Sequence, residues 1–140
     1  MIVMDCDAAI GITLGTQDGE ALRGLMIKNE EIISTSYLHA ELASALTKYV
    51  RAGLMDKDES VLNLKAAADL VHTFIPLEEN ITEAMIEGIR LGHSPYDMLY
   101  FTLARRNGAT LYTLDRKLID LCDKERIDCI YIYDLDPNDK

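Results

Sequence analysis

The sequence predicts an α/β fold, namely a three-layer α/β/α domain with a mainly parallel central sheet. Short β-prone runs alternate with longer helical segments along the chain, which is the order typical of parallel α/β domains. The first run, MIVM, is apolar at every position, as expected of a strand that is covered on both faces. A chain of 140 residues is also long enough to bury one substantial core.

Two strands and three helices are expected in the first half of the chain. Gly15 and Asn29 can end the first two helices, because both residue types tolerate a left-handed backbone. Ser36 can cap the start of the third helix, and Gly53 can end it. The expected elements are a strand at 1–4, helices at 8–14 and 18–28, a strand at 31–35 and a helix at 37–51.

The second half is expected to continue this alternation. Pro76 places the third strand at a sheet edge, since proline cannot donate a hydrogen bond to a strand ladder. Ser94 and Pro95 form a capped helix start, and Asn107 with Gly108 provides the matching end. The expected elements are a helix at 56–74, a strand at 74–77, helices at 80–92 and 95–107, a strand at 109–113, a helix at 115–125 and a last strand at 129–133.

Composition narrows the classes of function. The chain carries 24 acidic and 14 basic residues, and this net charge of −10 argues against non-specific polyanion binding by the whole surface. A nucleic-acid substrate could still be reached through a metal and a local basic patch.

No apolar run approaches the ~18 residues of a membrane span, and no secretion signal opens the chain, so we expect a cytoplasmic protein. Its three cysteines, without a CxxC pair, are expected to be free thiols.

Asp97 is the most unusual residue of the pattern. Helical spacing places it on the same face as Tyr100, Phe101 and Ala104, which is the face that a core helix buries. A carboxylate on such a face is costly unless another group compensates its charge. Asp97 therefore indicates that the fold brings other charged groups beside it.

Four acids occupy comparable places in the expected fold. They follow strands or lie on the helices that flank them, and the carboxyl ends of parallel strands meet at one edge, where sites form if the strand order reverses. If the first and fourth strands are neighbours at that reversal, all four acids face one crevice. These acids are Asp5, Glu41, Asp97 and Asp115.

Each acid also has a purely structural interpretation. Asp115 could cap its helix, Asp97 could pair with Ser94 in a capping-box-like turn, Glu41 could be a solvated edge residue, and Asp5 could be a turn residue. Convergence would nevertheless make the four carboxylates repel one another, and a hard divalent cation with oxygen ligands removes that penalty. Because no histidine stands at ligand spacing, Mg²⁺ or Mn²⁺ is expected rather than Zn²⁺.

Such a site suits the hydrolysis of phosphodiesters, since metal ions can activate water and hold the scissile phosphate. A negatively charged substrate would also need nearby cations. The candidate phosphate contacts are Arg116, Lys117, Arg105 and Lys48, for each of which ordinary surface charge is the alternative.

Three segments together resemble the PIN-domain family, the fold of the VapC-type toxins of toxin–antitoxin pairs. These segments are IVMDCDAAI, YLHAELASALTKY and SPYDMLYFTLARRNGATLYTLDRKL, and the resemblance covers residues 1–133 in the family's order and spacing. It implies one PIN-like domain at 1–133, followed by an acidic tail at 134–140 that we expect to be frayed.

The resemblance also implies an activity and a site. The activity is that of a metal-dependent ribonuclease acting on RNA, with Mg²⁺ or Mn²⁺ held by the four acids. Thr113 matches the family hydroxyl that helps to orient those acids. The expected partners are a second copy of the chain, in a homodimer, and an antitoxin protein. The RNA target cannot be deduced from the pattern.

The sequence departs from the family pattern just after the first acid. Family members usually carry Thr or Ser and then Ser, where this chain has Cys6 and Asp7. Asp7 is either a fifth acid of the site or the N-cap of a helix that begins at Ala8, and we favour the cap. In either role it adds negative charge beside the site.

Two other classes of function fit part of the sequence. The D-x-D of Asp5-Cys6-Asp7 suggests a haloacid-dehalogenase-type phosphatase, but Ala8-Ala9 stands where Gly-Thr would be expected. A PIN fold that has lost catalysis and serves as a binding module is the second alternative, which Asp7 and the acidic surface favour. RNA cleavage, phosphomonoester hydrolysis and the absence of both activities distinguish the three hypotheses.

Overall fold

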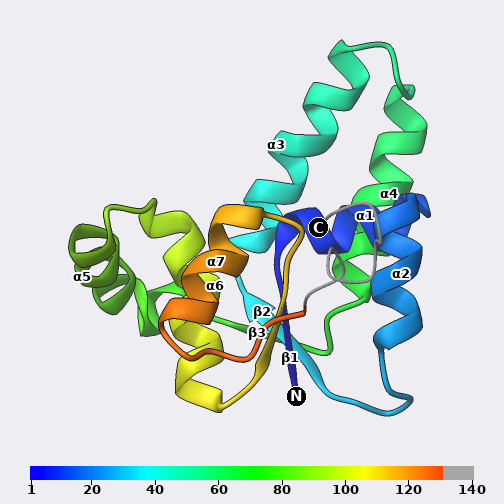
Figure 1. The fold of residues 1–140 in the computed structure, drawn as a ribbon. Helices are drawn as coiled ribbons and strands as arrows, with labels where there is room; N and C mark the ends of the chain where they lie inside the picture. The colour runs from blue at the N-terminus through cyan, green and yellow to red at the C-terminus, as the bar shows by residue number, and fades with distance from the viewer. Residues whose placement is uncertain (131–140) are drawn as a thin grey trace.

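The computed structural model describes residues 1–130 of the chain, and a four-stranded parallel sheet forms its centre (Figure 1). The strand order is β3-β2-β1-β4, and all three pairings are parallel. The strands are β1 (Ile2–Met4), β2 (Ile32–Thr35), β3 (Thr73–Ile75) and β4 (Thr110–Tyr112). This α/β/α architecture with a parallel sheet is the one that the sequence predicted.

The strand order reverses at β1, which is the feature that creates the site. From β1 the chain moves outward to β2 and β3, and it then returns to place β4 on the other side of β1. Val3 pairs with Ile33 of β2 and with Leu111 of β4. The first and fourth strands are thus neighbours at the reversal, as predicted, and β3 lies at the sheet edge, as Pro76 indicated.

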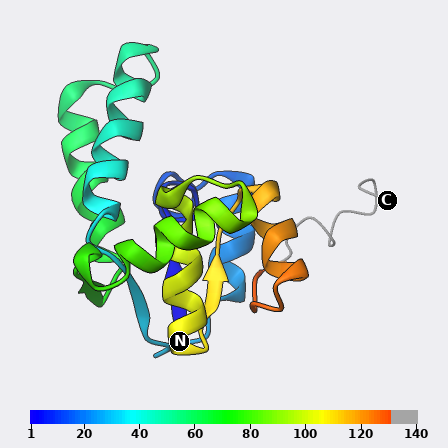
Figure 2. The same cartoon turned by 90° about the vertical axis from the view of Figure 1, so that its left-hand side faces the viewer.

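Helices cover both faces of the sheet. In Figure 1, α5, α6 and α7 lie to the left of the strands, and α1, α2 and α4 lie to the right. The helices α3 and α4 form a hairpin that extends beyond the body of the domain, as Figure 2 shows from the side. The helices are α1 (Cys6–Leu14), α2 (Gln17–Leu25), α3 (Leu38–Arg51), α4 (Lys57–Asp69), the 3₁₀ turn η1 (Leu77–Glu79), α5 (Ile81–Leu91), α6 (Pro95–Asn107) and α7 (Arg116–Lys124).

Several helix ends follow the sequence signals. Ser94 accepts a hydrogen bond from the Tyr96 N–H at the start of α6, and Asp115 accepts one from the Lys117 N–H at the start of α7. Gly15 and Gly108 end α1 and α6 with positive φ angles of 67° and 56°, where a side chain would be strained.

Two predicted caps were wrong. Ser36 does not cap α3, because its Oγ accepts a hydrogen bond from the Leu77 N–H, while Thr35 accepts the Tyr37 N–H. Asp7 does not cap α1, because the helix begins two residues earlier than expected, at Cys6. The cap is Asp5, whose carboxylate accepts the Ala8 N–H at 2.9 Å.

The C-terminal elements are described only in part. Cys129 forms an isolated parallel bridge with Leu111, so the predicted last strand begins to pair with β4. The remainder of that strand, 131–133, and the acidic tail at 134–140 lie outside the described residues. The three cysteines are free, as predicted, and all three are buried. Within residues 1–130, no helix combines the length and apolar character that a bilayer crossing requires.

Gly19 lies at a close contact between α1 and α2. A Cβ placed on Gly19 would lie 1.9 Å from the Gly11 carbonyl oxygen, which is backbone and cannot rotate away. We expect Gly19→Ala to lower the free energy of unfolding by about 3 kcal/mol, since overpacking displaces the helix. In the same helix, Gly24 has no neighbour within 4 Å of such a Cβ. Gly24→Ala should stabilise by up to about 1 kcal/mol. Urea unfolding of both variants measures the difference, and equal effects would contradict the close crossing.

Candidate functional site

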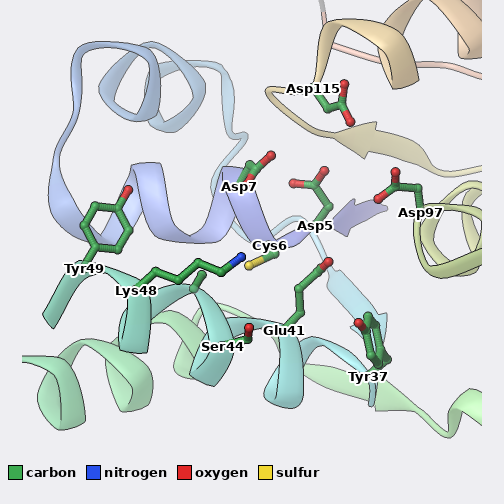
Figure 3. A pocket seen from close by; sticks show the side chains of 11 residues that line it. Asp5, Cys6, Asp7, Tyr37, Glu41, Ser44, Lys48, Tyr49, Asp97 and Asp115 are labelled. Atoms are coloured by element: carbon green, nitrogen blue, oxygen red, sulfur yellow. The ribbon is translucent and has the colours of Figure 1, made fainter. Parts of the chain in front are cut away.

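A pocket of about 420 Å³ opens at the carboxyl edge of the sheet, where the strand order reverses (Figure 3). The four predicted acids all line it, and Asp7 joins them. They come from five places in the chain: Asp5 follows β1, Asp7 lies in the first turn of α1, Glu41 in that of α3, Asp97 in that of α6, and Asp115 caps α7.

Asp5 is the most buried acid of the pocket, with 6% of its surface exposed. Its N–H donates to the Tyr112 carbonyl at 3.1 Å, which ties the end of β1 to β4. Burial raises the pKa of Asp5 well above its ordinary value, and the charges of Asp7 and Glu41 raise it further. Hydrogen bonds from Thr113 and the Ala8 N–H oppose this rise in pKa. Asp5 is therefore a buried acid whose charge the protein alone does not fully compensate.

Thr113 connects the acids that flank β1 and β4. It is fully buried, its side chain hydrogen-bonds the Asp5 carboxyl, and its Oγ1 accepts the Asp115 N–H at 3.1 Å. The backbone of Asp115 is thereby fixed relative to Asp5 through one hydroxyl. The structure thus places Thr113 where the resemblance implied an orienting hydroxyl.

Glu41 reaches the pocket from α3 and is held by an aromatic residue of α6. The Tyr100 hydroxyl donates a hydrogen bond to Glu41 Oε1 at 2.7 Å. Burial raises the pKa of Glu41, the Tyr100 bond lowers it, and the charges of Asp97 and Asp7 raise it. Tyr100 is itself 1% exposed, so the bond fixes Glu41 against the protein core.

Asp7 lies among the acids, so the structure supports the less favoured of its two predicted roles. Burial raises the pKa of Asp7, and the charges of Asp115 and Asp97 add to the rise. The sequence could not decide this point, because the choice depended on whether the helix begins at Cys6 or at Ala8.

His93 is the site residue that the sequence analysis missed. It lies in the loop between α5 and α6, and its Nε2 is 3.0 Å from Asp97 Oδ2. His93, Asp97 and Asp115 each offer a ligand atom, and these three atoms lie within 4.8 Å of one another. The expectation that no histidine accompanies the acids was therefore wrong. The available signal was the four-residue separation from Asp97, but His93 precedes the helix start, where helical spacing does not apply.

A stacked pair of tyrosines, one of which lines the pocket, was also missed. Tyr37 lines the pocket, and its ring stacks on that of Tyr96 with centroids 5.1 Å apart and planes 15° apart. Tyr96 is half exposed. Because the pair joins the start of α3 to the start of α6, only the tertiary structure could reveal it.

The predicted phosphate contacts are divided between the pocket and the surface. Of the described residues that line the pocket, Lys48 alone is basic, and it reaches in from α3 (Figure 3). Arg116 and Lys117 are exposed in the first turn of α7, directly after Asp115. Arg105 does not line the pocket. Its guanidinium pairs with Glu83 at 2.7 Å and Glu87 at 3.5 Å, so it connects α6 to α5.

The donor set of the pocket fits a divalent cation. Five carboxylates face one space, and burial, with the charges of neighbouring acids adding to it, raises the pKa values of Asp5, Asp7 and Glu41. Carboxylate oxygens are the ligands that Mg²⁺ and Mn²⁺ take in proteins, and a cation would relieve the repulsion among them. The imidazole of His93 adds one nitrogen donor to this set.

No protein-family model matches the chain. A curated protein, Ribonuclease VapC3 from Pyrobaculum aerophilum, is 26% identical over 124 residues, which are 85% of this chain and 92% of that protein.

Two solved structures share the fold. PAE2754 from Pyrobaculum aerophilum has a TM-score of 0.64 at 22% identity, covering 85% of this chain and 82% of its own. VapBC2 from Rickettsia felis, solved bound to a DNA fragment from their promoter, has a TM-score of 0.63 at 20% identity, covering 93% and 98%. The chain therefore has the PIN-domain fold of the VapC-type proteins, and the resemblance identified in its sequence is confirmed.

Proposed function

We propose that this protein is a metal-dependent endoribonuclease that hydrolyses RNA phosphodiesters, and that it is the toxin of a toxin–antitoxin pair. The observation that carries the proposal is the convergence of Asp5, Glu41, Asp97 and Asp115 in one pocket at the strand-order reversal. The similarity to Ribonuclease VapC3 supports the same chemistry.

In this proposal, Asp5, Glu41, Asp97 and Asp115 hold Mg²⁺ or Mn²⁺. When bound, such a cation supplies water activation and neutralises charge on the phosphate and the leaving oxygen. The protein's own groups keep the carboxylates in place. Thr113 bonds to Asp5 and to the Asp115 backbone.

Other groups of the chain orient the site and receive the substrate. Tyr100 fixes Glu41 through its hydroxyl. Lys48 contacts substrate phosphates inside the pocket, with Arg116 and Lys117 outside it on the first turn of α7. Arg105, which the sequence suggested for the same role, is assigned instead to its pairs with Glu83 and Glu87.

The decisive experiment is cleavage of single-stranded RNA by the purified chain. We expect cleavage with Mg²⁺ or Mn²⁺ and none with EDTA. Asp97→Asn should remove the activity while the variant keeps its fold, because its side chain is 31% exposed and holds little of the core. Cleavage that survives this substitution would contradict the site assignment. Hydrolysis of a phosphomonoester without RNA cleavage would favour the phosphatase alternative, and absence of both would favour a binding module.

We also propose two protein partners, a second copy of the chain and an antitoxin. Two groups of exposed apolar side chains support them, since exposed apolar patches mark interaction sites. One group, on α5, consists of Met85, Ile86 and Ile89, and the other, on the α3–α4 hairpin, consists of Leu54, Val61 and Leu62. A two-fold dimer needs one self-complementary patch, which we assign to α5. Light scattering tests this assignment, and a monomer at high concentration would contradict it.

A further inference from the structure

We infer that His93 is a direct ligand of the cation, which makes this a mixed nitrogen and oxygen site that prefers Mn²⁺ to Mg²⁺. The inference rests on the proposed metal-dependent function and extends it to the identity of the metal. It concerns a residue of this chain that lies outside the four acids of the resemblance.

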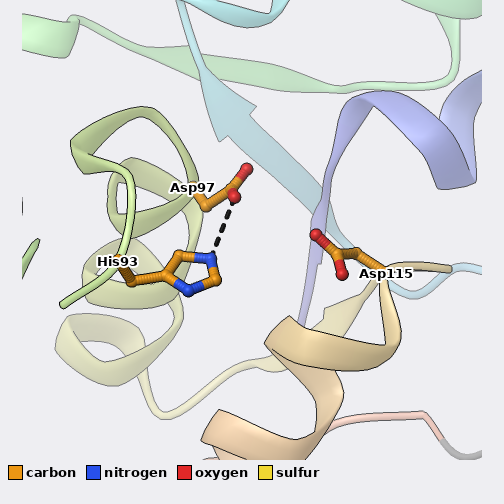
Figure 4. A group of neighbouring side chains, drawn as sticks. All are labelled: His93, Asp97 and Asp115. Carbon is orange, nitrogen blue, oxygen red and sulfur yellow. Dashed lines mark hydrogen bonds and ion pairs between the residues drawn. The ribbon is translucent and has the colours of Figure 1, made fainter. Parts of the chain in front are cut away.

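The geometry brings one imidazole nitrogen and two carboxylates to a common point. His93 Nε2 lies 3.0 Å from Asp97 Oδ2, and the ligand atoms of His93, Asp97 and Asp115 lie within 4.8 Å of one another. Figure 4 shows His93 beside Asp97, with Asp115 facing them from the start of α7. All three side chains are partly buried, so they are neither isolated from solvent nor free to swing widely. Two atoms 3 Å apart can bind one cation without a large movement.

The backbone holds His93 in this position. Its N–H donates to the Gly88 carbonyl at 3.0 Å, and its own carbonyl lies 2.8 Å from where a Cβ of Gly88 would be. The loop can therefore pack this closely on α5 only because residue 88 is glycine. Ser94 and Pro95 then begin α6 directly after it, so the loop is fixed at both ends. A ligand held this way loses little conformational entropy when a cation binds.

The donor chemistry decides the choice of metal. Mg²⁺ prefers oxygen ligands and gains little from imidazole, whereas the divalent ions of the transition series bind imidazole nitrogen more strongly. The three remaining pocket acids, Asp5, Asp7 and Glu41, keep the site rich in oxygen, which Mn²⁺ also accepts. The alternative role for His93 is to orient Asp97 by their hydrogen bond alone. In that role no imidazole nitrogen would coordinate the cation.

Pulsed EPR of the protein loaded with Mn²⁺ separates these two roles, because a coordinated imidazole gives a ¹⁴N modulation of the Mn²⁺ signal. We expect this modulation in the natural protein and its loss in His93→Gln, which retains a polar side chain beside Asp97. The chain has three histidines, so the matched control is His39→Ala on the exposed start of α3. The control should keep the modulation.

A titration of Mn²⁺ by EPR, with Mg²⁺ as competitor, measures the preference itself. We expect His93→Gln to weaken Mn²⁺ binding by about 10-fold or more, the size typical of losing a group that holds or orients a metal, with little change for Mg²⁺. Equal weakening for both ions would overturn the preference.

The outcomes also separate this inference from the proposed function. Bound Mn²⁺ without ¹⁴N modulation in the natural protein, or modulation that persists in His93→Gln, would overturn the inference and leave the acidic metal site intact. No binding of Mn²⁺ by the natural protein would overturn both. RNA cleavage with Mg²⁺, assayed separately, reports on the proposed function alone.

Discussion

Replacement of Asp5 by Asn is expected to lower RNA cleavage by on the order of 10²–10³-fold, the loss seen when one preorganised electrostatic group is removed from an active site. The same substitution is expected to make the metal-free protein more stable, by about 1–2 kcal/mol at neutral pH. The two effects have opposite signs because the same buried charge helps to bind the cation and, without the cation, destabilises the folded state.

The physical reason lies in the surroundings of Asp5. Its carboxylate is buried beside Asp7 and Glu41, and among residues 1–130 it is Thr113 and the Ala8 N–H that compensate it. Asparagine keeps an oxygen that can accept the Ala8 N–H, so α1 retains its cap, while the repulsion disappears. The amide is a poorer ligand than the carboxylate and carries no charge for a cation to balance.

Asp120→Asn is the matched control for this prediction. Asp120 is an exposed acid of α7, away from the pocket lining, and its loss changes the net charge by the same amount. We expect neither cleavage nor stability to change appreciably. Steady-state cleavage and thermal unfolding in EDTA measure both properties. A loss of stability in metal-free Asp5→Asn would contradict the inference that the buried charge of Asp5 destabilises the fold.

The second large effect concerns the pH dependence of stability in the metal-free protein. The pKa values of Asp5, Asp7 and Glu41 are raised in the folded state, chiefly by burial. A group with a raised folded pKa binds its proton more tightly when folded, so it favours folding at low pH. We therefore expect the stability to fall as the pH rises from about 4, the ordinary carboxyl value, through the folded-state pKa values.

The ion pairs between α5 and its neighbours act in the opposite direction and in a different pH range. Hydrogen bonds to arginines hold the pKa of Glu83 and Glu87 below the ordinary value, despite the opposing effect of their partial burial. Their contribution is present above about pH 4 and is lost as the pH falls through the lowered pKa values. The two opposing trends should give the metal-free protein its greatest stability near the ordinary carboxyl pKa.

Thermal unfolding in EDTA between pH 4 and pH 8 tests this dependence. Addition of Mn²⁺ or Mg²⁺ should remove the decline at higher pH, because a cation that binds only the folded state adds about 2.7 kcal/mol at 100 times its dissociation constant. Asp5→Asn should reduce the slope without the metal. Stability that rises steadily from pH 5 to pH 8 in EDTA would contradict the raised pKa values of these carboxylates.

The sequence determined most of the local structure, because local structure depends on nearby residues. The apolar run of β1, the Ser94-Pro95 start of α6 and the glycine ends of α1 and α6 are all encoded within a few positions. The four acids could be chosen in advance for a related reason. Parallel strands place their carboxyl ends at one edge, so chain order alone restricts where those acids can meet.

Contacts between distant segments were not accessible in this way. Ser36 was expected to cap α3, but it binds the Leu77 N–H, a residue 41 positions away that no local pattern indicates. Arg105 was suggested for the substrate, yet the packing of α5 on α6 pairs it with Glu83 and Glu87. In both cases a side chain had several possible partners, and the tertiary fold decided which of them it contacts.

The functional site also combines features that the sequence determines with features that depend on contacts between distant segments. The sequence by itself determined the fold class and the set of acids that includes Asp97 and Asp115, because residue type and order carry that information. Only the tertiary structure decided that Asp7 belongs with those acids and that His93 stands 3.0 Å from Asp97. The reason is physical. The position of His93 depends on how closely the loop packs against Gly88, and the role of Asp7 depends on the residue at which α1 begins.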